Sequence, residues 1–158
     1  MTDIELPGLA PADAVIAAEM AVLGAAIESK TAAEAAAEHV TAADYWNPQH
    51  QLVAEAVEHL IETGQPVSPV AVLKALTDRG ARIAGPGLFL HRLMEHRSAS
   101  VAYDAQIIAR DAVRRRVLQA AHRATVIAAR GDFDPDEDTD RIRQAIDGAV
   151  SRFTGQRL

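Results

Sequence analysis

The sequence predicts an all-α protein in which a compact multi-helix globular head is followed by a long antiparallel helical hairpin. Alanine fills 33 of the 158 positions, whereas Phe, Tyr and Trp fill 3, 2 and 1, and this composition favours packed helices over a β-sandwich. The 49% of apolar residues is enough to bury a core and argues against a disordered chain. Apolar residues also recur at helical spacing along most of the chain.

The first helix is predicted from Pro11 to about Glu28. Pro11 stands where a proline at the first helical position belongs. Gly24 interrupts the helix, which costs about 1 kcal/mol relative to alanine, so either a neighbouring backbone packs closely there or the glycine is simply tolerated. The prediction rests on apolar residues that share one helical face: Ile16, Met20, Leu23 and Ile27.

Three further helices complete the predicted head up to Gly80. Thr31 and Glu34 have the spacing of a capping box and open an alanine-rich helix that reaches about residue 40. The pair at 47–48, Asn then Pro, begins the next helix, which ends at Gly64. A short helix then runs from 68 to 80, where two prolines argue against a strand.

The remaining helices are predicted after a turn at 85–87. A short helix with Phe89 and Leu93 follows that turn, and one long helix without internal glycine or proline runs from about 100 to 130. Gly131 ends the long helix, after which Asp134, Pro135 and Glu137 supply an N-cap, a first-turn proline and a capping-box acid. The long helix carries a near-heptad stripe of Val113, Val117, Ala121, Ala124 and Ile127 or Ala128, and the last helix carries Ile142, Ala145, Ile146, Ala149, Val150 and Phe153 on one face.

The predicted domain organisation has four parts. We expect a flexible N-terminal segment over 1–10, the head over 11–98, the hairpin over 99–154 and a tail or linker over 155–158. A two-helix hairpin buries only its inner face, so outer apolar residues need a partner chain. The candidate self-association and partner interface comprises Ile107, Ile108, Arg114, Arg115, Val117, Ile142, Ile146 and Phe153.

Charge is distributed unevenly along the chain. The formal net charge of −6 combines −10 for residues 1–78, +7 for residues 79–130 and −3 for residues 131–158. The acidic first half argues against nonspecific wrapping by nucleic acid, so any DNA contact must use the basic segment. In that segment Arg110, Arg114, Arg115 and Arg116 serve either solubility and ion pairing, as between Asp111 and Arg115, or an interface with an acidic surface.

The motifs of catalysis are missing from the sequence. There is no cysteine, and neither of the two lysines follows a glycine, which excludes a P-loop in this chain. His91, Glu95 and His96 have poor metal-ligand spacing, and the acids of 132–140 lack the glycine and glutamate of a calcium loop. We therefore expect no catalytic, cofactor or metal site. The N-terminus is not a signal peptide, so we expect a cytoplasmic protein.

Several segments occur together in the order of a known family. These are AAEMAVLGAAI at 17–27, DYWNPQHQLVAEAV at 44–57, GQPVSPVAVLKAL at 64–76, LFLHRL at 88–93 and SVAYDAQIIARDAVRRRVL at 100–118. In this order and spacing the chain resembles the N-terminal domain of DnaB-type replicative helicases. The residues that match singly are Glu19, Val22, Leu23, Gly24, Pro48, His50, Gly64, Pro66, Tyr103, Ala105, Ile107 and Arg115. Ser100, Met20 and Asp104 depart from the family pattern and leave room for a phage or plasmid protein or a divergent paralogue.

The resemblance implies a noncatalytic domain with two roles. It implies a collar of paired hairpins, as a dimer or a trimer of dimers, and docking of a DnaG-type primase or a helicase loader during DNA replication. ATP and Mg²⁺ would act only in a motor domain outside this chain, and the parent protein would be an ATP-dependent DNA helicase. Two alternatives remain open: a stand-alone, motorless adaptor that regulates a helicase or primase, and a small DNA-binding protein that uses Arg110–Arg123.

Overall fold

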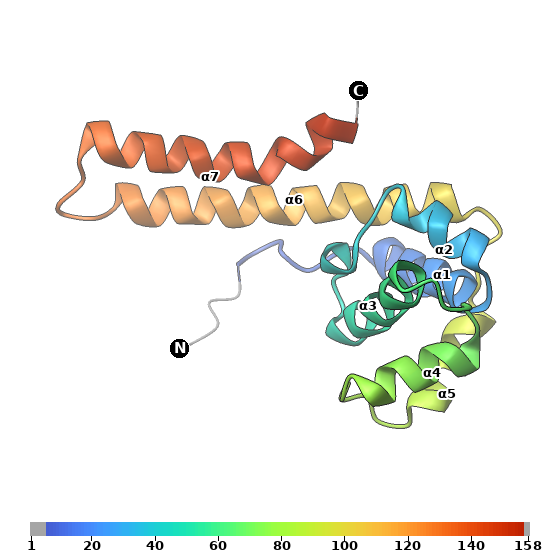
Figure 1. Cartoon of the computed structure of the whole chain (residues 1–158). Coiled ribbons are helices and arrows are strands. Elements are labelled where there is room, and N and C mark those ends of the chain that lie inside the picture. Colours follow the sequence, from blue (N-terminus) through green and yellow to red (C-terminus); the bar gives the residue numbers. More distant parts are fainter. Residues whose placement is uncertain (1–5, 157–158) are drawn as a thin grey trace. The chain divides into compact units, whose positions relative to one another are not determined.

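The computed structural model describes the backbone of residues 6–156 and the side chains of residues 6–151. Within this range the chain is helical, with seven α-helices, one short 3₁₀ helix and no strand, so the predicted all-α fold class is confirmed (Figure 1). The elements are α1 (Asp13–Glu28), α2 (Lys30–Ala37), η1 (Ala42–Asp44), α3 (Pro48–Glu62), α4 (Pro69–Asp78), α5 (Pro86–Glu95), α6 (Val101–Ala128) and α7 (Pro135–Gln156).

The chain divides into two compact units. The head unit comprises Pro11–Arg110, and the hairpin unit combines Met1–Ala10 with Asp111–Leu158. The division lies inside α6, because Ala105 and Ile108 of that helix are buried in the core of the head. Of the predicted flexible segment 1–10, the structure describes residues 6–10, and of the predicted tail it describes the backbone of residues 155–156.

The head is built around α1. This helix packs against α2, α3, α4 and α5, so its side chains are buried on several sides. Because helices surround it, nine of its sixteen residues are buried. Its sequence is accordingly apolar around most of the helix circumference. The largest side chains of the head that are essentially inaccessible to solvent are Leu23, Ile27, Leu93 and Ile108, together with Glu19, Val22, Val53 and Val72.

Gly24 lies where the backbones of α1 and α5 come close together. A Cβ atom built on Gly24 would lie 2.1 Å from the Leu93 carbonyl oxygen and 3.1 Å from the Arg97 Cα. Both neighbours are backbone atoms, which cannot move aside as a flexible side chain would. The close-approach interpretation of this glycine is therefore the correct one.

A buried carboxylate fastens the start of α3 to α1. Glu19 has no solvent-exposed surface and lies 2.8 Å (Oε1) from His50 Nδ1. The backbone amides of Trp46 and Asn47 also donate to its two carboxylate oxygens, over 2.5 and 3.3 Å. Because the carboxylate itself is removed from water, these hydrogen bonds are what make the burial of Glu19 possible.

Some helix starts differ from their predicted positions by a few residues. The cap of α2 is Ser29, whose hydroxyl accepts from the Ala32 amide, rather than the predicted Thr31. Pro11 lies two residues before α1, and its neighbour Ala12 is the N-cap. The predicted starts at Asn47 and Ser68 are confirmed, because both side chains accept a hydrogen bond from the first turn of their helix.

The hairpin unit joins the second part of α6 to α7 through a short connection (Figure 1). Asp134 caps α7 as predicted, since its Oδ1 accepts from the amides of Asp136 and Glu137. The acid that reaches back is Asp138 and not the predicted Glu137, because Asp138 Oδ2 accepts from the Asp134 amide over 2.9 Å. The predicted inner face of α7 is confirmed for Ile142, Ala145, Ile146, Ala149 and Val150, all of which are buried or half-buried.

Candidate assembly surface of the hairpin unit

The first turns of α6 inside the hairpin unit hold a compact cluster of charges. Asp111 Oδ1 accepts from Arg114 Nε over 2.8 Å, and Oδ2 accepts from Arg115 Nε over 2.9 Å. Asp111 and Arg115 are both buried. The ion pair predicted between them is present, and the ion-pairing interpretation of this part of the basic run is therefore correct.

Arg114 also holds the N-terminal segment. Its guanidinium donates to the carbonyl oxygens of Gly8, Leu9 and Ala10, over 3.2 Å for Leu9 and 3.4 Å for Ala10. Asp111 accepts from the Nε of the same guanidinium, which restricts its orientation. The residues just before the head are thus attached to α6 by one side chain with all of its nitrogens engaged.

Apolar side chains remain uncovered on α6 within the hairpin unit. Val117 is 37% exposed in the second half of α6, and Val126 is 52% exposed in its last turn. Ala121 and Ala128 are exposed as well, and they share one helical face with Val117 at spacings of four and eleven residues. We refer to Val117, Ala121 and Ala128 as the outer stripe of α6.

The predicted heptad stripe is thereby split between two environments. Val113, Ala124 and Ile127 are half-buried, whereas the outer stripe is open to solvent in this chain. Ala120 is fully buried instead of its neighbour Ala121. A single helix packed on one side cannot bury an entire heptad stripe, and the uncovered part is the surface available to another chain.

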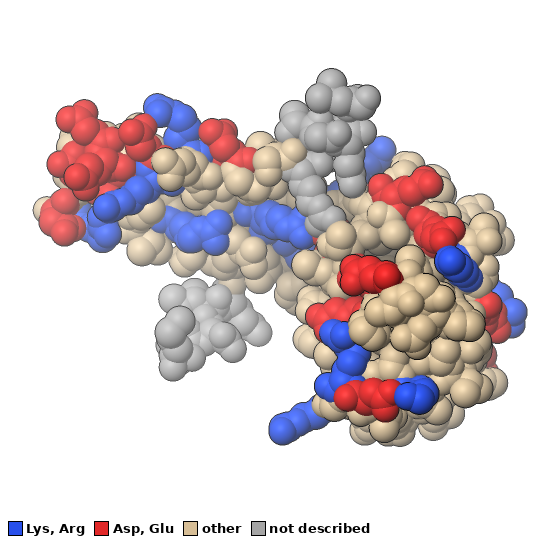
Figure 2. Space-filling view, in the orientation of Figure 1, with Lys and Arg blue, Asp and Glu red and all other residues tan. Residues whose placement is uncertain are grey.

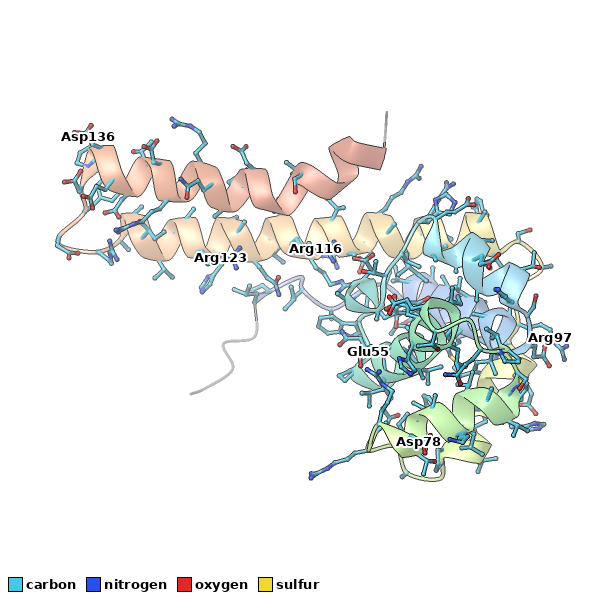
Figure 3. The ribbon with its side chains drawn as sticks, in the orientation of Figure 1. Glu55, Asp78, Arg97, Arg116, Arg123 and Asp136 are labelled. Carbon is cyan, nitrogen blue, oxygen red and sulfur yellow. The ribbon has the colours of Figure 1, made fainter. Side chains whose placement is uncertain are left out.

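The connection between α6 and α7 is acidic. Red side chains gather at this end of the hairpin in Figure 2, where Asp136 is labelled in Figure 3. Asp138 is buried and accepts from Arg130 over 3.0 Å and from Arg141 over 2.9 Å. The hydrogen bond from the Asp134 amide is the largest influence that lowers the pKa of Asp138, and the charges of the two arginines lower it further.

Basic side chains follow α6 between the two ends of the hairpin (Figure 2). Arg116 and Arg123, seven residues apart, both lie on this helix in Figure 3. Arg130 continues the row and pairs with Asp132 over 3.6 Å in addition to Asp138. Acidic partners thus already occupy much of the basic segment, since Asp111 holds two of its arginines and the connection holds a third.

The structure places the eight predicted interface residues in three settings. Ile108 is fully buried in the head, and Ile107 is half-buried against the same core. Arg114 and Val117 are exposed on α6, whereas Arg115 is buried beside Asp111. Ile142 and Ile146 are half-buried on the inner face of α7, and the side chain of Phe153 lies outside the described residues.

Sequence reasoning missed several exposed apolar residues. Val126 is absent from the predicted interface because it falls off the heptad spacing, and Phe133 stands in the acidic connection with 38% exposure. Among the described residues there is no group of three His, Asp or Glu side chains placed to hold a metal ion. None of the described helices is long and apolar enough to cross a membrane.

Comparison with known proteins identifies a family and several relatives. Residues 12–110 match the DnaB-like helicase N terminal domain family. The chain is 35% identical over 111 residues to the replicative DNA helicase DnaB of Mycobacterium leprae (strain TN), and 33% identical over 111 residues to that of Leifsonia xyli subsp. xyli (strain CTCB07). Each alignment covers 68% of this chain but only 18% and 24% of the respective relative, so the chain spans less than a quarter of the length of either.

A solved structure matches over most of the chain. It is the crystal structure of the N-terminal domain of DnaB helicase from Mycobacterium tuberculosis, with 33% sequence identity and a TM-score of 0.76. The match covers 83% of this chain and 94% of the solved one.

Proposed function

The chain belongs to the DnaB-like helicase N-terminal domain family, and from this premise we propose that it assembles with copies of itself through the hairpin unit and docks a replication partner. The proposed assembly is a dimer or a trimer of dimers in which hairpins pair. The proposed partner is a DnaG-type primase or a helicase loader. The chain itself is proposed to be noncatalytic, with ATP and Mg²⁺ used by a motor domain outside it.

One observation carries the self-association proposal: the outer stripe of α6 is apolar and uncovered. Val117 is 37% exposed and shares its face with Ala121 and Ala128. Small side chains at these positions permit close approach of a second helix, and burial of the stripe in a pair removes apolar surface from water. A copy of the same hairpin offers a stripe of matching length, as a two-fold symmetric contact requires.

The test is the oligomeric state in solution. Val117→Asp places a charge in the outer stripe without touching the core, whereas Val70→Asp makes the same change on α4 of the head, where the valine is 76% exposed. We expect the unmodified chain and Val70→Asp to associate as concentration rises in analytical ultracentrifugation, and Val117→Asp to stay monomeric. A strictly monomeric unmodified chain at high concentration contradicts the proposal.

Ile146→Asp is a less informative variant. Ile146 is half-buried on the inner face of α7, so a charge there disturbs the hairpin itself as well as any contact between chains. Loss of association in this variant therefore has two explanations. Val117→Asp distinguishes the two explanations, because Val117 is exposed and a charge there leaves the packing within the hairpin intact.

Partner docking is proposed on the family relationship and needs its own measurement. Titration of the chain with the DnaG-type primase of the same organism is expected to give saturable binding that requires the assembled form. If Val117→Asp binds the primase as tightly as the unmodified chain does, docking does not depend on hairpin pairing. Absence of binding to primase and loader alike removes this part of the proposal.

The two alternatives make different predictions. A stand-alone adaptor would appear in the source cell as a gene product near 16.9 kDa, and a helicase collar would appear in a product several times larger. A DNA-binding protein would bind duplex DNA with an affinity that falls steeply with salt. The ion pairs already made by Arg114 and Arg115 within the segment Arg110–Arg123 favour the assembly proposal over this last alternative.

A further inference from the structure

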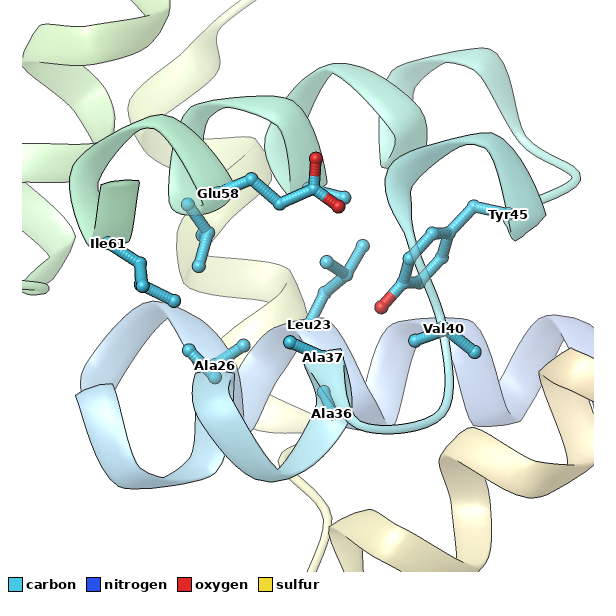
Figure 4. A pocket seen from close by; sticks show the side chains of 11 residues that line it. Leu23, Ala26, Ala36, Ala37, Val40, Tyr45, Glu58 and Ile61 are labelled. Carbon is cyan, nitrogen blue, oxygen red and sulfur yellow. The ribbon is translucent and has the colours of Figure 1, made fainter. Parts of the chain in front are cut away.

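The head unit contains a hollow between α2 and α3 that the proposed hairpin assembly does not use. The outer part has a volume of about 300 Å³ and is lined by Ala37, Val40, Thr41, Glu58, Ile61 and Glu62. A smaller cavity of about 30 Å³ lies beneath it and shares four of these residues. Figure 4 shows Ala36 and Ala37 of α2 on one side of the cavity and Glu58 and Ile61 of α3 on the other.

The walls are apolar because alanine lines them. Ala26, Ala33, Ala36 and Ala54 surround the inner cavity together with Leu23 and Val57. Short side chains on facing helices leave space that larger ones would fill, which is the physical origin of the hollow. The hollow therefore provides an apolar floor that is open to solvent at its outer end.

The rim of the hollow carries negative charge without compensation nearby in the sequence. Residues 31–73, which run from the second residue of α2 through η1 and α3 into the start of α4, contain six acidic residues and no lysine or arginine. Lys30, the first residue of α2, pairs with Glu34 and not with the acids of the rim. Glu58 accepts from the Ala42 amide over 2.7 Å through one oxygen, and among the described residues no lysine or arginine pairs with Glu58 or Glu62. An apolar floor with an acidic rim is complementary to an apolar side chain flanked by cations.

The protonation of Glu58 reflects the same environment. Burial is the main influence that raises its pKa, and the charges of Glu62, Glu55 and Asp44 raise it further, while the hydrogen bond from Ala42 opposes the shift. Tyr45, whose ring borders the cavity, has its pKa raised by burial and by neighbouring acids, so its hydroxyl stays protonated. A cation brought to this rim would relieve repulsion that the chain itself leaves in place.

We propose that the hollow between α2 and α3 is a docking site for a segment of a partner protein that presents an apolar side chain flanked by lysine or arginine. The apolar side chain enters the outer hollow over Ala37 and Ile61, and the cationic groups meet Glu58 and Glu62. Nucleic acids and anionic membranes carry the wrong charge for this rim. The site lies wholly in the head unit, so it does not rest on hairpin pairing.

The experiment uses two synthetic helical peptides of equal length as probes. Both carry one leucine face, which is flanked by lysine in the first peptide and by glutamate in the second. We expect the lysine peptide to bind the whole chain and the glutamate peptide not to bind, as measured by fluorescence anisotropy. Amide chemical shifts of α2 and α3 are expected to change on binding, whereas those of α7 are not.

Matched variants then test the location of the site. Glu58→Gln with Glu62→Gln removes two charges from the rim and keeps an acceptor for the Ala42 amide. The control, Glu34→Gln with Glu38→Gln, removes two charges that do not line the hollow, one from α2 and one from its C-cap. Because exposed charge pairs contribute little each, the rim pair is expected to weaken binding by about five- to tenfold, and the control pair by less than twofold. Circular dichroism checks that both pairs remain folded.

Four outcomes overturn the proposal. They are no binding of the lysine peptide at millimolar concentration, equal binding of both peptides, equal weakening by the two pairs of substitutions, and shift changes that fall outside α2 and α3. If the rim substitutions change the oligomeric state instead, a second copy of the chain occupies the hollow and the proposed partner is wrong. Val117→Asp is expected to bind the lysine peptide as tightly as the unmodified chain does. This result would show that the hollow works independently of the proposed hairpin assembly.

Discussion

The head and the hairpin unit bury very different side chains. In the head, Leu23, Ile27, Val53 and Leu93 are essentially inaccessible to solvent, and helices surround α1 on several sides. Among the described side chains of the hairpin unit, the buried apolar residues are alanines such as Ala120 and Ala149, while Ile142 and Ile146 of α7 are only half-buried. The head closes a core by itself, whereas two helices alone leave apolar surface open to another chain.

The same difference appears in how the two units use charge. The head buries Glu19 beneath three donors, a network that fixes one element against another. The hairpin unit forms its buried ion pairs locally, within α6 at Asp111 and between the connection and the first turn of α7 at Asp138. Buried charge in the head therefore joins two elements that are far apart in the sequence, and buried charge in the hairpin unit joins residues that are close in the sequence.

The largest effect is expected from Glu19→Ala. Removal of the carboxylate leaves the buried His50 and the half-buried amides of Trp46 and Asn47 without their acceptor, which is expected to cost about 2 to 4 kcal/mol of unfolding free energy. Chemical denaturation measures this loss. Glu38→Ala, which removes an exposed acid of the head, serves as the control. A loss below 1 kcal/mol would mean that the network does not hold α3 to α1.

Two glycine substitutions sharpen the comparison further. Gly24→Ala forces a Cβ into the Leu93 carbonyl and is expected to destabilise by about 2 to 3 kcal/mol. Gly148→Ala in α7 meets no atom within 4 Å and is expected to stabilise by about 0.5 to 1 kcal/mol. If the melting temperature falls for Gly24→Ala and rises for Gly148→Ala, the contrast between a close helix contact and an open helix face is supported. Equal changes in the two variants refute it.

Capping of α7 is expected to have a smaller effect. Asp134→Ala removes the acceptor for the amides of Asp136 and Glu137 and is expected to cost about 1 kcal/mol. Hydrogen exchange should quicken in the first turn of α7 and remain unchanged in α3. Asp134→Asn keeps the acceptor and is expected to restore most of the protection.

The smallest effects concern pH, and the two units respond with opposite sign. Asp138 has a lowered pKa, so its contribution is complete above its ordinary value of 3.8 and is lost as pH falls through the folded-state value. Glu58 has a raised pKa, so its ionisation penalises the head at neutral pH and the penalty is relieved on acidification. Amide exchange near α7 should therefore rise below about pH 4 in the unmodified chain.

Matched substitutions separate these contributions. Asp138→Asn should abolish the acid-dependent part of exchange near α7, and Asp147→Asn, an exposed acid of the same helix, should leave it unchanged. Glu58→Gln should remove the gain in stability of the head that acidification otherwise brings. An identical pH profile for all three variants would show that other groups control the acid response.

Much of the fold follows from local signals in the sequence. The cap pairs at 47–48 and 68–69 and the apolar face of α7 predict helix positions closely, because caps and periodicity act within a few residues. The exact caps of α2 and the acid that reaches back in α7 were shifted by one or two residues, since Ser29 competes with Thr31 and Asp138 with Glu137. Several residues that carry the family resemblance, such as Glu19 and Gly24, proved to hold helices together.

The candidate assembly surface was predicted less completely than the fold. The sequence placed Val117 on an apolar stripe but also included Ile108, which the head buries, and omitted Val126, which is exposed. Periodicity identifies an apolar face but does not say which neighbour covers it. The hollow between α2 and α3 was equally invisible, because it depends on alanines from three separate helices.

The sequence by itself determined the helical class, the order of the elements and the uneven charge, because composition, caps and spacing act locally. Only the tertiary structure decided that Gly24 admits the Leu93 backbone, that Glu19 meets His50, and that Val117 is left uncovered. Each of these depends on residues far apart in the chain or on the number of helices that surround a position. Packing in three dimensions, rather than local preference, thus separates core from interaction surface.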